Sequence, residues 1–169
     1  MQTRLEIAGL HERLKSTMIY VTRDQGEAMT LAYKIMVLHD CQIEQVGSPM
    51  QLYHTPENAF VAQFISSTKM KLFSCSDLKK PTTTVCTKGI RPKHLTLADR
   101  DTSQIEGHLE LVEQLGEYAL AHLITPLGAK FMVKLPTPPL NQIGKMLWFN
   151  ALPKVTHHYD TDNGQWLYF

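Results

Sequence analysis

Three polar residues that follow a short apolar run are the first candidates for chemistry. Arg23 stands after Thr17–Thr22, a β-branched and apolar run typical of a strand buried on both faces. As a fixed cation, Arg23 could contact a phosphate, but an ordinary surface arginine at a strand end is favoured. Asp24 and Glu27 could form a catalytic carboxylate pair. Their spacing also fits an N-cap followed by a capping-box carboxylate, and this interpretation is favoured.

Two further groups could bind a ligand. Arg91, Lys93 and His94 would suit an anion, although a turn at a domain junction accounts for them without one and is favoured. His157 and His158 are of metal-ligand type. Adjacent residues of a strand point to opposite faces and make a poor chelate, so we predict two solvent-exposed histidines and no metal site.

Composition excludes several classes of protein. The 169 residues carry a net charge of +1, which predicts no nucleic-acid or polyanion partner. Cys41, Cys75 and Cys86 are odd in number and contain no C-x-x-C pair, so reduced thiols are expected. No apolar run approaches the roughly 20 residues of a membrane-spanning helix. The first residues lack the apolar core of a signal peptide. These features favour the cytoplasm.

The first part of the chain has a β/α rhythm, which periodicity and capping residues define. The predicted elements are a helix over Arg4–Lys15, a strand over Thr17–Thr22, a helix from Asp24 to about Lys34, strands over Ile35–Leu38 and Gln42–Val46, and two short helices, one capped at Ser48 and one at Thr55, each cap being followed by proline.

Composition shifts at Ser66–Thr68, and short alternating runs beyond it predict an all-β module. Turn signals separate five predicted strands, which cover Leu109–Gln114, Tyr118–Ile124, Lys130–Leu135, Met146–Phe149 and Gln165–Phe169. This spacing suits a small barrel of the OB type. Ser74–Lys88 has no clear pattern.

Three blocks of sequence, taken in order, make a specific pattern. They are Thr17–Leu38, the stretch from Gln45 to Ile65, and Gly89–Leu95 with the sequence Gly-Ile-Arg-Pro-Lys-His-Leu. Together they resemble the C-terminal half of the ATP-binding subunit of bacterial carbohydrate ABC importers, closest to the maltose-importer branch. In this family a histidine that reaches the ATP γ-phosphate stands where this chain has Arg23.

The resemblance implies an α+β protein with two parts. Residues 1–67 would be the C-terminal end of an ABC nucleotide-binding α/β domain. Residues 68–169 would be an OB-like regulatory domain of the TOBE/MOP type, shortened between Leu72 and Gly89. The regulatory-domain motif would comprise Gly89, Ile90, Arg91, Pro92 and His94.

The family's nucleotide chemistry is missing from this sequence. It contains no G-x-x-x-x-G-K-[ST] phosphate loop, no LSGGQ signature and no strand ending in Asp-Glu. The resemblance therefore implies a chain truncated before the nucleotide-binding motifs. Arg23 occupies the switch-histidine position, so we expect no catalytic residue and no cofactor here, ATP and magnesium belonging to the intact family. Whether the chain has enzymatic activity of any kind stays open.

The same resemblance suggests partners and a location. The chain would self-associate or bind an intact ATPase subunit, and the parent family works with membrane permease subunits. It would be cytoplasmic or peripheral at the inner face of the cell membrane. Two alternatives stay open, a stand-alone regulatory or dimerisation module and an oxyanion-binding barrel.

Overall fold

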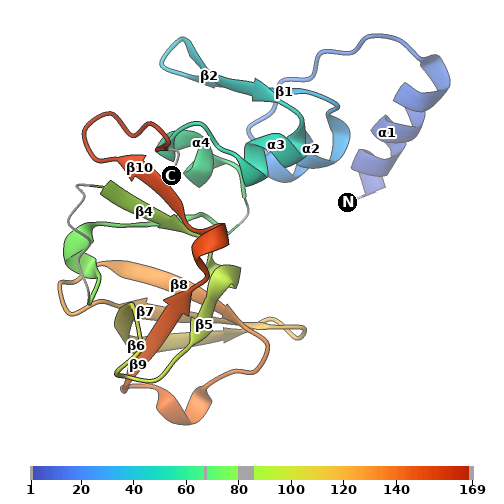
Figure 1. Cartoon of the computed structure of the whole chain (residues 1–169). Coiled ribbons are helices and arrows are strands. Elements are labelled where there is room, and N and C mark those ends of the chain that lie inside the picture. The colour runs from blue at the N-terminus through green and yellow to red at the C-terminus, as the bar shows by residue number, and fades with distance from the viewer. Residues whose placement is uncertain (1, 67, 80–85, 168–169) are drawn as a thin grey trace. The chain divides into compact units, whose positions relative to one another are not determined.

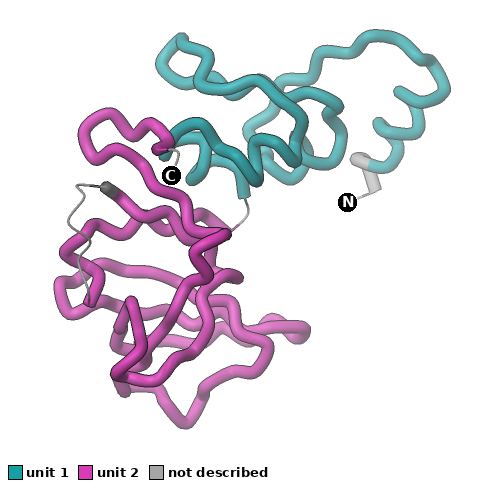
Figure 2. The backbone as a smooth tube through the Cα atoms, viewed as in Figure 1, with its two compact units in different colours: residues 1–67 teal, residues 68–169 magenta. Residues whose placement is uncertain are grey.

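The computed structural model describes residues 2–66, 68–79 and 86–167. It contains two compact units, unit 1 (Met1–Ser67) and unit 2 (Thr68–Phe169), coloured separately in Figure 2. Each unit is considered by itself. None of the helices in the described ranges has the length and apolar content needed to cross a membrane.

The described residues of unit 1 combine four helices with one β-hairpin (Figure 1). The elements are α1 (Gln2–Leu14), α2 (Gln25–Leu31), β1 (Ile35–His39), β2 (Gln42–Gly47), α3 (Pro49–His54) and α4 (Ala59–Phe64). The predicted helices and the two hairpin strands are confirmed within a few residues. The helix predicted to reach Lys34 ends at Leu31, because Ala32 has an extended backbone.

A small core joins the hairpin to the helices of unit 1. Its buried side chains alternate along β1 and line one side of α3 and α4, and they are Ile35, Val37, Leu52, Val61 and Ile65. Ser48 and Gln51 form a complete capping box at the start of α3, as predicted. The cap of α4 is Asn58 rather than Thr55, since the Asn58 side chain accepts from the Val61 amide at 2.9 Å.

The predicted strand over Thr17–Thr22 is wrong. The structure has no secondary structure there, and the side chains of Ile19 and Val21 are 91% and 92% exposed. A strand needs a neighbour to accept and donate its backbone hydrogen bonds. No strand within the described residues pairs with this segment. Its sequence has the β-branched character of a strand, yet the neighbour decides whether a ladder forms.

Unit 2 is almost entirely β-structure in its described residues (Figure 1). Its strands are β3 (Lys71–Phe73), β4 (Cys86–Ile90), β5 (Leu95–Leu97), β6 (Ile105–Gln114), β7 (Ala119–Ile124), β8 (Lys130–Leu135), β9 (Met146–Ala151) and β10 (His157–Asp160). Single 3-10 turns lie between them, namely η1 (Cys75–Asp77), η2 (Pro92–His94), η3 (Leu140–Gln142) and η4 (Pro153–Val155).

These strands of unit 2 form two antiparallel sheets. One sheet has the order β10-β4-β3 and the other β5-β9-β6-β7-β8. The larger sheet is curled. Its edge strand β8 lies next to η2 and next to β5, which is the strand at the other edge of the same sheet. Curling of this kind removes open edges. The all-β, OB-like part of the predicted fold is therefore confirmed.

The core of unit 2 lies on the inner side of this curled sheet. Alternate residues of β7 and β8 point inward, and the rings of Phe73, Phe131 and Phe149 meet edge-to-face. Gly107 of β6 allows Phe131 to approach, since a Cβ there would lie 2.6 Å from that ring. Such packing leaves little room for a larger residue at position 107.

Four of the five predicted barrel strands are confirmed, as β6 to β9. The fifth, over Gln165–Phe169, is wrong in its described part. There Trp166 makes only an isolated bridge to Tyr159 of β10, while residues 168 and 169 lie outside the described ranges. Ser74–Lys88, which showed no pattern, contains η1 and the first residues of β4, and residues 80–85 are also outside those ranges.

The turn of the unit 1 hairpin holds two residues other than glycine in the left-handed region. Asp40 has φ of 46° and Cys41 has φ of 62°, and His39 pairs with Gln42 on either side. Positive φ at both central residues is the geometry of a type I′ turn, which favours glycine at its second central position. The Cβ of Cys41 therefore strains this turn.

Cys41→Gly should stabilise unit 1 by about 1 kcal/mol, because glycine adopts positive φ without steric cost. Cys41→Ser is the matched control, since it removes the thiol but keeps the Cβ, and it should leave stability unchanged. Both tryptophans, Trp148 and Trp166, lie in unit 2. Because tryptophan fluorescence does not report on unit 1, its stability is measured by native-state hydrogen exchange of the β1 and β2 amides. Equal protection of these amides in Cys41→Gly and Cys41→Ser would show that the Cβ of Cys41 does not strain the turn.

Candidate functional site

The residues predicted to form a regulatory-domain motif lie where β4 ends and η2 begins. Gly89 pairs with Leu72 of β3 on one side and His157 of β10 on the other. A Cβ at Gly89 would lie 2.6 Å from the Met70 sulfur and 2.7 Å from Cε2 of Tyr159. The absence of a side chain at position 89 is thus what allows these two buried side chains to pack over the middle strand.

Arg91 is the most unusual member of the motif, because it is a charged side chain that is only 2% exposed. It precedes Pro92 at the first position of η2. Its charge acts on Tyr159, which is also fully buried. Burial raises the pKa of the Tyr159 phenol, and the positive charge of Arg91 opposes that rise in part. The motif therefore joins a buried cation to a buried phenol.

The three cationic residues of the motif differ in their access to solvent. Lys93 is exposed and His94 is half-buried, whereas Arg91 is buried. An anion from solvent would therefore meet Lys93 but not the guanidinium of Arg91. Gly89, Ile90, Arg91 and Pro92 are all buried, and they lie where β4 is followed by η2.

The residues predicted at the end of Thr17–Thr22 surround the start of α2. Asp24 is the N-cap, and its carboxylate accepts from the Glu27 amide at 3.0 Å, as predicted. The predicted return bond of a capping box is wrong. The Glu27 carboxylate accepts from the Thr22 hydroxyl at 2.7 Å and from the Tyr20 hydroxyl at 3.1 Å. Arg23 lies at the bend between these residues and is exposed.

His157 and His158 occupy adjacent positions on β10 and are half-buried, so the predicted solvent exposure is wrong. The His157 ring lies 5.9 Å from the ring of Trp166. Burial lowers the pKa of His158, and Lys88, its partner across the sheet, lowers it further. Within the described residues, no three His, Cys, Asp or Glu side chains gather closely enough to hold a metal ion.

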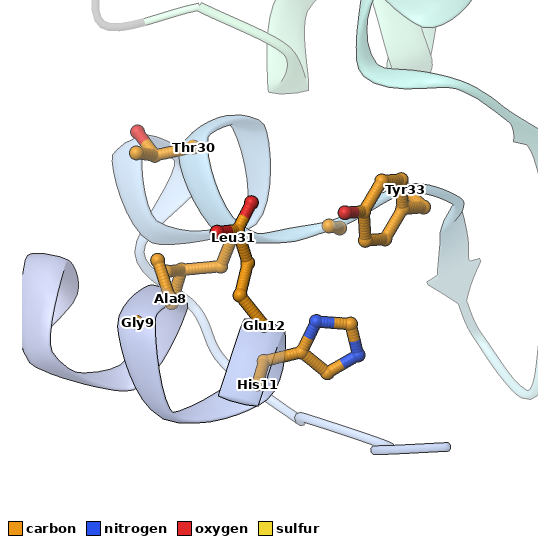
Figure 3. A pocket seen from close by; sticks show the side chains of 8 residues that line it. Ala8, Gly9, His11, Glu12, Thr30, Leu31 and Tyr33 are labelled. Carbon is orange, nitrogen blue, oxygen red and sulfur yellow. The ribbon is translucent and has the colours of Figure 1, made fainter. Parts of the chain in front are cut away.

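A hollow of about 420 Å³ lies in unit 1, between α1 and the end of α2, and no sequence pattern indicated it (Figure 3). The rings of His11 and Tyr33 lie 5.7 Å apart at its rim. The other lining residues are Ala8, Gly9, Glu12, Thr30, Leu31 and Ala32. Because the residues of α1 and α2 that meet here are distant in the sequence, no local motif could have indicated the hollow.

A comparison with models of known protein families identifies a domain in unit 2. Residues 89–158, which run from the close-packed glycine to β10, match the model of the TOBE domain. Unit 2 therefore contains a TOBE domain.

The chain as a whole is similar to import ATP-binding proteins. It is 41% identical to the maltose/maltodextrin import ATP-binding protein of Photobacterium profundum, over 80% of this chain and 44% of the relative. It is 35% identical to the sn-glycerol-3-phosphate import ATP-binding protein of Pectobacterium atrosepticum, over 97% of this chain and 51% of the relative. The predicted relation to ATP-binding subunits of carbohydrate ABC importers is thereby confirmed. The chain spans about half the length of these curated relatives.

Gly89→Ala should destabilise unit 2 by about 1–3 kcal/mol, because the added methyl group overpacks Met70 and Tyr159. Urea unfolding followed by tryptophan fluorescence measures the loss. Met70→Ala makes room at the same place, so Gly89→Ala should cost less in that background than alone. Additive losses in the double variant would show that the methyl group does not meet Met70.

Tyr159 should stay protonated until unit 2 unfolds. Its raised pKa contributes stability that is complete below the unfolded value near 10 and is lost as the pH rises above it. The 295 nm titrations of the native chain and of Tyr159→Phe should therefore coincide up to about pH 11. In guanidinium they should differ by one of the six tyrosines, which is the control. A difference in the native titrations would contradict the buried phenol.

Proposed function

We propose that this chain is part of the ATP-binding subunit of a sugar ABC importer, acts through its TOBE domain, and does not bind or hydrolyse ATP by itself. The main support for this proposal is the match of residues 89–158 to the TOBE domain, in a chain that is 35–41% identical to import ATP-binding proteins. Under this proposal, residues 1–67 are the end of a nucleotide-binding domain and residues 68–169 the regulatory domain.

The lack of ATP chemistry follows from the residues present. Phosphoryl transfer requires a phosphate-binding loop, a metal site and a positioned base or water. The sequence contains no phosphate-loop pattern, and Arg23 takes the place of the histidine expected after Thr22. The described residues provide no cluster that could hold a metal ion. A single exposed arginine cannot replace these groups, so under this proposal residues 1–169 do not bind ATP and magnesium by themselves.

The partners follow from the same proposal. In a working importer the chain would act beside an intact ATP-binding subunit and membrane permease subunits, at the inner face of the cell membrane. Self-association through unit 2 would be the form of the chain on its own. Neither partner involves nucleic acid, because the net charge is only +1.

The alternative of an oxyanion-binding barrel has less support. It would need the cations of the Gly89–Leu95 motif to meet an anion. Arg91 is buried, and its charge acts on Tyr159 instead. Molybdate or sulfate would have to raise the melting temperature of the chain for this alternative to be preferred.

Calorimetric titration with ATP and magnesium should give no binding tighter than the millimolar range. The full-length relative from Photobacterium profundum, titrated in the same way, is the positive control. Arg23→His is the matched variant, and it should not restore binding, since the missing phosphate loop is the larger defect. Micromolar binding by the unmodified chain would overturn the proposal.

A further inference from the structure

The turn that follows β10 contains the one asparagine–glycine pair of the sequence. Of the four asparagines, only Asn163 is followed by glycine. The Asn163 side chain is exposed, and Gly164 has φ of 69°, a conformation that glycine adopts without steric cost. Glycine also has no Cβ that would crowd its amide nitrogen. Asn163 and Gly164 are therefore the pair in this chain best suited to cyclise.

An asparagine before glycine can deamidate without an enzyme. The glycine amide gives its proton to a base, and its nitrogen attacks Cγ of the asparagine. A new C–N bond closes a cyclic imide, while the bond from Cγ to the side-chain nitrogen breaks and that nitrogen leaves as ammonia with a proton from solvent. Water then opens the imide at either carbonyl, which gives aspartate or isoaspartate. Water is the only reactant besides the chain itself.

In the folded turn the attacking nitrogen is occupied. The Gly164 amide donates to the Asp160 carbonyl at 3.0 Å. The Asp160 carboxylate belongs to the same turn, since it accepts from the amides of Asp162 and Asn163 at 2.9 and 3.1 Å. A hydrogen-bonded amide beside a negative charge does not readily lose its proton to a base. The turn must therefore open before Gly164 can react.

One contact of the turn acts in the opposite direction. The side-chain oxygen of Asn163 accepts from the Gln165 amide at 2.8 Å, and this hydrogen bond polarises Cγ for attack. Polarisation speeds the reaction only when a deprotonated nitrogen is present. The hydrogen bond of the Gly164 amide therefore decides the rate.

We propose that Asn163–Gly164 is a deamidation site, and that opening of the Asp160–Gln165 turn controls its reaction with water. Base-catalysed hydrogen exchange of the Gly164 amide begins with the same two steps, which are opening of its hydrogen bond and loss of its proton. Folding therefore slows deamidation of Asn163 and exchange of the Gly164 amide by the same factor.

The isoaspartate product lengthens the main chain within this turn. Two backbone hydrogen bonds span the turn, one from the Asp160 amide to the Gln165 carbonyl and one from the Leu167 amide to the His158 carbonyl, both at 2.8 Å. They flank the bridge between Tyr159 and Trp166. An extra main-chain atom between the paired ends shifts their register, so we expect isoaspartate at position 163 to release Trp166 from β10.

The test compares the folded full chain with a peptide of residues 157–167 in the same mildly alkaline buffer. Mass spectrometry of a digest measures the fraction of Asn163 converted, from the mass gained when OH replaces the side-chain NH2. Hydrogen exchange gives the protection factor of the Gly164 amide. The deamidation rate in the folded chain should be lower than in the peptide by about tenfold or more, and by the protection factor to within about threefold.

Two variants test the role of the turn. Asp160→Ala removes the side-chain acceptor of two turn amides, so it should raise the deamidation rate and lower the Gly164 protection factor together, by about threefold or more. Asp160→Asn is the matched control, because it keeps a side-chain oxygen as acceptor, and it should change both quantities less. Asn163→Gln keeps the amide but would have to close a larger ring, so it should show no conversion.

Three results would overturn the proposal. Absence of conversion in the peptide would remove the site itself. Conversion of the folded chain at the rate of the peptide, with the Gly164 amide protected, would show that the turn does not control the reaction. A rate in Asp160→Ala that does not follow its own protection factor would show the same. If Asp160→Ala unfolds, its Gly164 protection vanishes and its rate should equal that of the peptide, so the relation is still tested.

Discussion

The close approach of two buried side chains to the backbone of Gly89 is the constraint on which unit 2 depends. Met70 and Tyr159 can reach β4 only because position 89 has no Cβ. β4 lies between β3 and β10, and both its last residue, Ile90, and the next residue, Arg91, are buried. The chain then passes through η2 into β5, at one edge of the curled sheet. A short motif thus connects the two sheets.

The apolar core of unit 1 is smaller than that of unit 2. The hairpin, α3 and α4 share a small apolar core, and two buried polar side chains complete it. Gln45 donates to the Thr55 carbonyl and accepts from the Glu57 amide, and Asn58 donates to Glu44. Thr17–Thr22 shares none of this support. Burial in unit 1 is therefore concentrated between Ile35 and Ile65.

The two units differ in how they bear on the proposed function. The described residues of unit 2 share one apolar core, and residues 89–158 match the TOBE domain. Unit 1 has an exposed apolar segment beside Arg23 and contains no phosphate-binding loop. A regulatory contribution needs only a stable surface, whereas ATP chemistry needs several groups positioned together.

The sequence by itself determined those structural elements that are stabilised by residues only a few positions apart. Capping residues such as Ser48 and Asp24, and the alternation along Lys130–Leu135, could be recognised because their partners lie within a few positions. Only the tertiary structure decided what depends on distant neighbours. It buried the side chain of Arg91, and it left Thr17–Thr22 without a ladder. A backbone hydrogen bond or a buried charge is stable only when its partner is present, and sequence pattern alone does not reveal that partner.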